Sequence, residues 1–312
     1  MNELVFFEGQ FVPLDDAKVS VKTHAFMYGT SLFEGIRGYW VPERNEISIF
    51  RLKEHYERLL SNCRIFHMDL GYTLQELMDI TVELVQKNNP DYDTYIRPMA
   101  YKADVEKIGF SLLNTESRFL VWTHPLGNYV DIERGLSVCV SNWRRLEDSM
   151  IPPRAKAGGA YVNSALAVTD ARKAGFDDAI VLTERGTVSE GTGMNLFMVK
   201  NGRLVTPATT ENILEGITRD TIATLARQEL GIETQERVVH RTELYTADEL
   251  FFCGTGAQVA PITQVDHRPV GSGAIGPISR KIQDLYFRVV KGHVPGYSHW
   301  CTPVSVGAAA VR

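Results

Sequence analysis

The sequence predicts an α+β protein made of two domains. Its 312 residues are enough for two domains, and strand-like and helix-like segments occur in two blocks. A stretch with Pro125 and Gly127 separates the blocks and is typical of a linker. We therefore expect a small N-terminal α/β domain over 1–123, a linker over 124–133 and a larger C-terminal domain over 134–312.

In the first block, the strongest helix signal is Thr73 followed by Glu76, a capping box that opens an amphipathic helix to about Lys87. A second helix is indicated by apolar residues at helical spacing. The glycines and aromatics of 24–37 predict a bend that leads into a strand through Tyr39. The remaining predictions are strands at Phe6 to Val12 (two, around Glu8-Gly9), Ile47 to Phe50, Tyr95 to Tyr101 and Phe119 to Thr123, and the second helix at Leu52 to Phe66.

In the second block, Asn201-Gly202 is the strongest hairpin signal of the chain. Helices that stop at Gly175 and Gly231 follow the usual preference for a glycine just after a helix. The tail after Trp300 is expected to be frayed. We predict strands at 136–143, 179–183, 196–200, 203–206 and 249–253, and helices at 162–174, 218–230 and 277–290.

Composition narrows the class of protein. With 44% apolar and 23% charged residues, the chain is typical of soluble globular proteins. A net charge of -5 argues against nucleic acid as a partner, and no apolar stretch predicts a signal peptide or a membrane span, so a cytoplasmic location is expected. No histidine spacing suggests a metal site. The cysteines are scattered and predicted to be free thiols: Cys63, Cys139, Cys253 and Cys301.

One lysine stands out. Lys156 precedes two glycines and Tyr161 and follows Pro152-Pro153, so it lies on a predicted bend entering a helix. A lysine shielded from water there loses its charge readily and becomes a nucleophile towards carbonyls. The alternative is an ordinary solvated lysine.

Two glycine-containing turns could bind a ligand. In Gly216-Ile217-Thr218-Arg219-Asp220, a helix start could bind a phosphate through backbone N–H groups, or Thr218 could simply cap the helix. In Gly254-Thr255-Gly256-Ala257, the backbone could approach a ligand, or the segment could be a plain tight turn. By contrast, the G-x-G-x-x-G match at 271–276 lacks the βαβ context of a dinucleotide site, and we interpret it as a loop.

Three charged residues have two interpretations each. Glu190 lies among glycines, and is either a solvated turn residue or the partner of a cation. Arg97, in a β-rich run beside Tyr95, is either an edge arginine or a reader of carboxylates. Arg58 is by default a surface charge on its helix.

Taken together and in order, these motifs resemble the fold-type IV pyridoxal-phosphate enzymes (D-amino acid aminotransferase-like), and among them the branched-chain amino acid aminotransferases. The resemblance covers roughly Phe6 to Gly292. The motifs that carry it are 28–37 (YGTSLFEGIR), Arg58, 95–98 (YIRP), 156–159 (KAGG), 190–193 (EGTG), 216–220 (GITRD) and 254–255 (GT).

The resemblance implies a role for each residue of a pyridoxal 5'-phosphate (PLP) site. Lys156 would be the catalytic residue, forming the Schiff base with the cofactor and moving the proton at the substrate Cα. Glu190 would hold the pyridine nitrogen protonated, Tyr161 would bond the ring hydroxyl, and Leu214 would lie against the ring. The phosphate would be bound by Arg58, Gly216, Ile217, Thr218 and Thr255.

It also implies substrates: reversible amino transfer between L-leucine, L-isoleucine or L-valine and 2-oxoglutarate. Arg97 would bind the second carboxylate of glutamate, and the backbone at 255–257, including Gly256 and Ala257, would take the α-carboxylate. A homodimer is expected, with Tyr28 lent by a second subunit. The apolar wall for the branched side chain would be built from Tyr28, Phe33, Gly35, Tyr95 and Tyr129.

Several residues depart from the family pattern, and two alternatives stay open. The departures are Leu126, Ala160, Met194, 256–258 and the loop 106–114. One alternative is a D-amino acid or (R)-amine aminotransferase of the same fold. The other is a lyase of the aminodeoxychorismate type, which Arg97 and the apolar pocket disfavour.

Overall fold

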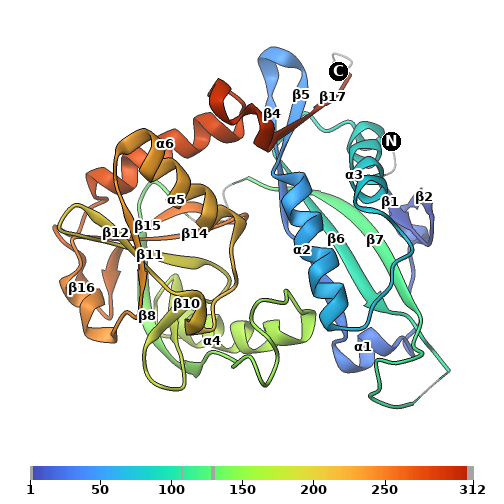
Figure 1. Cartoon of the computed structure of the whole chain (residues 1–312), viewed down its shortest axis with the longest axis horizontal. Coiled ribbons are helices and arrows are strands. Elements are labelled where there is room, and N and C mark those ends of the chain that lie inside the picture. Colours follow the sequence, from blue (N-terminus) through green and yellow to red (C-terminus); the bar gives the residue numbers. More distant parts are fainter. Residues whose placement is uncertain (1–2, 107, 128–130, 308–312) are drawn as a thin grey trace. The chain divides into compact units, whose positions relative to one another are not determined.

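The computed structural model describes residues 3–106, 108–127 and 131–307. Contacts group the chain into two compact units, each with its own sheet and helices (Figure 1). Unit 1 contains Met1–Gly127, Ala155–Gly159 and Arg288–Arg312, and unit 2 contains Asn128–Arg154 and Ala160–Phe287. The domain boundaries expected from the sequence, at 1–123, 124–133 and 134–312, stay a prediction.

Unit 1 is built on a sheet whose strand order is β17-β5-β4-β6-β7-β1-β2, with β3 paired to β6. Every pair in it is antiparallel, and the described residues supply eight strands. The strands are β1 (Leu4–Phe7), β2 (Gln10–Pro13), β3 (Ser31–Phe33), β4 (Ile36–Val41), β5 (Glu46–Phe50), β6 (Thr94–Lys102), β7 (Ser117–Pro125) and β17 (Cys301–Ser305).

The central strand β6 has two unlike faces. From Thr94 to Met99 its residues alternate between buried and half-buried, because successive side chains of a strand point to opposite faces. Tyr95, Arg97 and Met99 therefore share one face. Trp122 of β7 lies directly opposite Arg97, and so belongs to the same face.

Two helices of unit 1 were predicted and one was not. Helices α2 (Leu52–Ile65) and α3 (Leu74–Asn88) have the predicted bounds within one residue, and the Thr73–Glu76 capping box is present. The bend expected over 24–37 instead begins with a short helix, α1 (His24–Tyr28), which ends at Gly29 in the left-handed conformation. A five-residue helix gives too little periodicity to be recognised in a sequence.

The expected frayed tail is wrong for its first part. Residues 301–305 form β17, which pairs with β5 along its whole length, as the red strand beside the blue hairpin in Figure 1 shows. A strand paired to a distant segment carries no local signal in so short a stretch. Cys301 and the other three cysteines are free thiols, as predicted.

Unit 2 is built on a mixed sheet with the order β10-β9-β8-β15-β14-β11-β12-β13, and β16 paired to β15. Asn201 and Gly202 both have positive φ, so the predicted hairpin is confirmed. Within the described residues its strands are β8 (Leu136–Arg144), β9 (Asp178–Leu182), β10 (Val188–Gly191), β11 (Asn195–Lys200), β12 (Arg203–Pro207), β13 (Thr234–Arg237), β14 (Glu249–Gly254), β15 (Gln258–Val265) and β16 (Arg268–Pro269).

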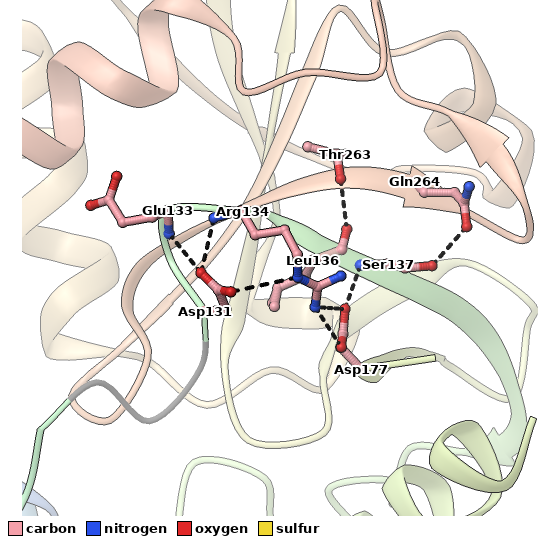
Figure 2. Close-up of polar contacts among 8 residues, drawn as sticks. All are labelled: Asp131, Glu133, Arg134, Leu136, Ser137, Asp177, Thr263 and Gln264. Carbon is pink, nitrogen blue, oxygen red and sulfur yellow. Dashed lines mark hydrogen bonds and ion pairs between the residues drawn. The ribbon is translucent and has the colours of Figure 1, made fainter. Parts of the chain in front are cut away.

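Polar contacts fix the register of β8 in this sheet (Figure 2). The Asp177 carboxylate accepts the backbone N–H of Ser137 and two bonds from Arg134. On the other side, the hydroxyl of Ser137 donates to Gln264 of β15 at 2.7 Å. β8 is thus held between β9 and β15, its two parallel neighbours.

The helices of unit 2 cover its sheet. α4 (Tyr161–Lys173) packs on β8 and β9, and α5 (Ile217–Leu230) packs on β13 and β14. α6 (Pro277–Val290) runs from unit 2 into unit 1, and the G-x-G-x-x-G match before it is a loop, as interpreted. Among the described residues, no helix is both long and apolar enough to cross a bilayer. Short 3-10 turns are η1 (Leu14–Asp16), η2 (Pro42–Arg44), η3 (Gly158–Ala160), η4 (Thr209–Glu211), η5 (Arg241–Thr246) and η6 (Pro295–Trp300).

Candidate active site

The backbone around Lys156 is fastened to β3 of unit 1. The Phe33 N–H donates to the Lys156 carbonyl at 3.0 Å, and Leu32 forms an isolated bridge with Ala157. The close approach of this segment to β3 requires a glycine two residues after Lys156, since a Cβ on Gly158 would lie 2.3 Å from the Ser31 hydroxyl oxygen. The K-A-G-G sequence is therefore what lets the lysine segment lie against a strand.

The side chain of Lys156 is half-buried beside an aromatic ring. Its Nζ lies 5.1 Å from the centre of the Phe33 ring. The predicted position on a bend entering a helix is confirmed, because η3 and then α4 follow directly. An ordinary solvated lysine does not fit this placement.

Arg58 is not the surface charge that its helix position suggests. Its Nε and Nη2 donate to the two oxygens of Glu34 at 2.8 and 2.7 Å, a bidentate pair. His55, one turn earlier on α2, lies with Nδ1 2.8 Å from the same carboxylate, so this nitrogen carries the proton that is donated. The Glu34 side chain is fully buried, whereas 14% of the Arg58 side chain is exposed.

The protonation states of Glu34 and His55 are well defined at neutral pH. Burial alone would raise the pKa of Glu34, but the charge and hydrogen bonds of Arg58 and the bond from His55 outweigh it and lower the pKa to about 2. Burial lowers the pKa of His55, which the Glu34 contact only partly opposes. Glu34 is therefore ionised and His55 neutral, so the trio has no net charge.

Arg97 lies among aromatic rings rather than at a sheet edge. β6 has neighbours on both sides, so the edge interpretation is wrong. The guanidinium carbon is 4.0 Å from the centre of the Phe33 ring, and Nε donates to the Tyr95 hydroxyl at 2.9 Å. Gly35 makes room for that hydroxyl, since a Cβ there would lie 2.6 Å from it. The structure thus gathers Phe33, Gly35, Tyr95, Arg97 and Lys156.

Tyr28 is the last residue of α1 and is half-buried. Its ring packs edge-on against His24 and against Phe110, at 4.8 and 5.1 Å between ring centres. Tyr129 lies outside the described residues.

In unit 2, Glu190 is buried on β10 and is not a solvated turn residue. Arg145 lies 2.7 Å from Oε1 in a salt bridge. The Asn195 amide and the backbone N–H of Leu214 both donate to Oε2, at 2.8 and 3.1 Å. A buried carboxylate with one charged and two neutral donors is rigidly oriented.

The same network fixes the start of α5. Asn195 also donates to the Leu214 carbonyl, and a Cβ on Gly216 would lie 1.9 Å from the Asn195 side-chain oxygen. Gly216 is the N-cap, so a Thr218 cap is wrong. Ile217 and Thr218 form the first turn, where backbone N–H groups point out of the helix end. Unit 2 thus brings together Glu190, Leu214, Gly216, Ile217 and Thr218.

The remaining predicted residues of unit 2 occupy a hairpin turn and a helix start. Thr255, Gly256 and Ala257 form the turn that joins β14 to β15, and Gln258 after them has a φ of 60°. Tyr161 is the first residue of α4 and is half-buried.

Sequence reasoning missed five residues of these clusters. Glu34 stands inside a motif that the resemblance uses, so a role for it could have been sought there. The others have no spacing that links them to their partners: His55, Trp122, Arg145 and Asn195.

A family profile described as amino-transferase class IV matches residues 31–265, which span both clusters. The chain belongs to the class IV aminotransferases. The resemblance drawn from the ordered motifs is confirmed, and with it the α+β, fold-type IV class.

The similarity to individual aminotransferases covers nearly the whole chain. A probable branched-chain-amino-acid aminotransferase of Aquifex aeolicus is 47% identical over 97% of each chain. A branched-chain aminotransferase of Thermoproteus uzoniensis, solved with norvaline, is 41% identical and has a TM-score of 0.93, covering 97% of this chain and all of that one. The branched-chain amino acid aminotransferase of Thermobaculum terrenum, solved in its PLP-form, is 38% identical with a TM-score of 0.92, over 97% of this chain and 98% of that one.

The residues of this aminotransferase fit PLP, the cofactor predicted from the sequence. The half-buried Lys156 amine suits an aldehyde, and the buried Glu190 carboxylate suits a protonated ring nitrogen. Arg58 and the start of α5 both present N–H groups of the kind that bind phosphate.

Proposed function

We propose that this chain is a branched-chain-amino-acid aminotransferase, which moves an amino group reversibly between L-leucine, L-isoleucine or L-valine and 2-oxoglutarate. The observation that carries the proposal is that both cationic side chains lie beside the Phe33 ring. The Lys156 amine is 5.1 Å and the carbon of the Arg97 guanidinium is 4.0 Å from the centre of that ring. An amine for the reacting end, an apolar wall and a cation for a second carboxylate are what the two kinds of substrate require.

We propose that the residues assigned by the resemblance would hold PLP. Lys156 would bind the aldehyde and Arg58 the phosphate. Tyr161 would bond the ring hydroxyl, and Leu214 would contact the ring. The backbone of Gly216, Ile217 and Thr218 and the hydroxyl of Thr255 would also bind the phosphate.

PLP, when bound, supplies an aldehyde that captures the amino group and a ring that accepts electrons. Glu190 holds a proton on the ring nitrogen, because a buried carboxylate stabilises the charged form of a cation beside it. The Lys156 amine takes the proton from the substrate Cα and returns it on the other side of the transfer. Its half-buried position beside Phe33 limits competition from water.

The apolar wall of the substrate site is formed by Phe33, Tyr95, Tyr28 and Tyr129, with Gly35 leaving room beside Tyr95. The turn Thr255–Ala257 binds the α-carboxylate through its backbone. Arg97 meets the distal carboxylate of glutamate, which is costly to bury without a charged donor.

We also propose a homodimer in the cytoplasm, with Tyr28 serving the site of the second subunit. The exposed apolar side chains next to it, Phe26 and Phe110, support a surface that another copy covers. Size-exclusion chromatography with light scattering measures the dimer directly.

The activity is tested with a panel of amino donors, each with 2-oxoglutarate as acceptor: L-leucine, D-leucine and an (R)-amine. Glutamate formation from L-leucine alone is the expected result. Activity with the D-amino acid or the amine and none with L-leucine would reject the branched-chain assignment. Pyruvate release from aminodeoxychorismate without an acceptor would indicate a lyase instead.

A further inference from the structure

Trp122 is placed by the sheet next to the arginine of the proposed substrate site. It lies directly opposite Arg97 in the β6–β7 register, and Tyr95 is two residues before Arg97 on the same strand. Side chains directly opposite in an antiparallel pair share a face and touch. The rings of Tyr95 and Trp122 are 6.0 Å apart, inclined at 54°.

The three rings on this face surround one guanidinium. The carbon at the centre of the Arg97 guanidinium lies 4.0 Å from the ring centre of Phe33, 5.0 Å from Tyr95 and 5.6 Å from Trp122. All three distances are within the range at which a ring attracts a cation. The same stacking restricts the rotation of a long, flexible side chain.

A neighbouring arginine shows how different this arrangement is. Arg37 of β4 is buried, donates to the carbonyls of Leu126 and Gly127 at 2.7 Å, and pairs with Asp93. Across the described ranges 3–106, 108–127 and 131–307, Arg97 has no carboxylate within salt-bridge distance. Aromatic faces stabilise its charge without using its N–H groups, and within those ranges only Nε is bonded, to Tyr95.

We propose that Trp122 is a specificity-determining residue. Its ring, together with those of Phe33 and Tyr95, holds the Arg97 guanidinium in the orientation that binds the distal carboxylate of a dicarboxylic substrate. This inference rests on the proposed function, because it concerns how one site accepts both glutamate and a branched-chain amino acid.

Trp122 should affect the binding of the two substrates differently. A carboxylate needs a planar donor pair in a fixed position, so its binding depends on how well Arg97 is held. A branched alkyl side chain needs only apolar contact, which Phe33 and Tyr95 supply without Trp122. Loss of the Trp122 ring therefore weakens dicarboxylate binding much more than binding of an alkyl acid.

The test uses two unreactive acids, bound to the PLP-loaded enzyme and measured by calorimetry. Glutarate ends in a second carboxylate and 4-methylpentanoate ends in an isopropyl group. For Trp122→Leu we expect the Kd of glutarate to rise on the order of tenfold, the size of a desolvated cation–π contact. The Kd of 4-methylpentanoate should change less than about twofold, within the scatter expected of a neutral surface change. Trp122→Phe, which keeps a ring, should restore most of the glutarate affinity.

Steady-state kinetics give a second, independent readout. In Trp122→Leu the KM for glutamate should rise with little change in kcat, and both constants for leucine should stay near their wild-type values. Trp143→Leu, in unit 2, is the matched control and should change the binding of neither ligand. Trp122→Met places a longer, flexible apolar side chain without a ring there, and replaces the leucine variant if that variant does not fold.

Equally weakened binding of both acids, or unchanged glutarate binding, would overturn the proposal for Trp122. Failure of the wild type to transfer amino groups from leucine would instead reject the proposed function. The two failures are distinguishable, because the ratio of the two dissociation constants is measured without turnover.

Discussion

Both units contain a buried glutamate paired with an arginine, and the two pairs are built differently. The Glu34 and Glu190 side chains are 0% and 4% exposed, and their partners Arg58 and Arg145 are 14% and 13% exposed. Glu34 binds its arginine through both oxygens and receives a further bond from His55 on the same helix. Glu190 has a salt bridge to its arginine at Oε1, while uncharged groups from β11 and a loop donate to Oε2.

The difference indicates which member of each pair is being positioned. A bidentate contact fixes the plane of the guanidinium, so Glu34 orients Arg58. Around Glu190, donors from three separate segments converge on the carboxylate, so the carboxylate is the group that is oriented. Four predictions test this contrast.

The largest effect is expected for Glu190→Gln. The amide cannot hold a proton on the cofactor's ring nitrogen, so proton abstraction from leucine should slow on the order of 10²–10³-fold. PLP should stay bound, because Lys156 and the phosphate-binding residues are untouched. Single-turnover absorbance changes measure the rate, and a near-normal half-reaction would remove Glu190 from this role.

Glu34→Gln should instead act on stability, in a defined pH range. The pKa of Glu34 is about 2 in the folded protein and 4.5 ordinarily, so its ionisation stabilises the fold above pH 4.5. This contribution, on the order of 3 kcal/mol, is lost as the pH falls from 4.5 towards 2. Urea unfolding at pH 7 and pH 3 should show a difference between variant and wild type that is roughly twice as large at pH 7, because folded Glu34 is still ionised at pH 3. A constant difference at both pH values would contradict the assigned pKa.

The same variant, Glu34→Gln, should weaken the binding of the cofactor's phosphate selectively. Without Glu34, Arg58 is less well fixed, so apoenzyme should bind PLP about tenfold more weakly, roughly one charge-assisted hydrogen bond. Binding of pyridoxal, which has no phosphate, should be unchanged. Fluorescence titration compares the two ligands, and equal weakening of both would mean that Glu34 is merely structural.

The smallest effect is expected for Arg145→Leu. Asn195 and Leu214 still donate to Glu190, so the half-reaction with leucine should slow only a few-fold at pH 8, as for one lost contact among several. A loss as large as that of Glu190→Gln would show that the salt bridge, and not the uncharged donors, orients the carboxylate.

The contrast also shows what the sequence could and could not predict. Arg58, Glu190 and Lys156 were found because they belong to one ordered series of motifs, and glycines required by close contacts stand beside Glu190 and Lys156. Arg145 and Trp122 were not found, because each meets its partner through strand pairing or a loop that brings distant segments together. Most strands and helices followed from period and capping signals, whereas α1 and β17 were too short or too dependent on a distant partner.

The most direct test of the account is where PLP attaches. Holoenzyme is reduced with borohydride, digested, and mapped by mass spectrometry. The account predicts a single phosphopyridoxyl label on Lys156, and none there in Lys156→Ala, with Lys173→Ala at the surface end of α4 as the matched control. A label on any other lysine of the wild type would contradict the assignment of Lys156 as the residue that carries the chemistry.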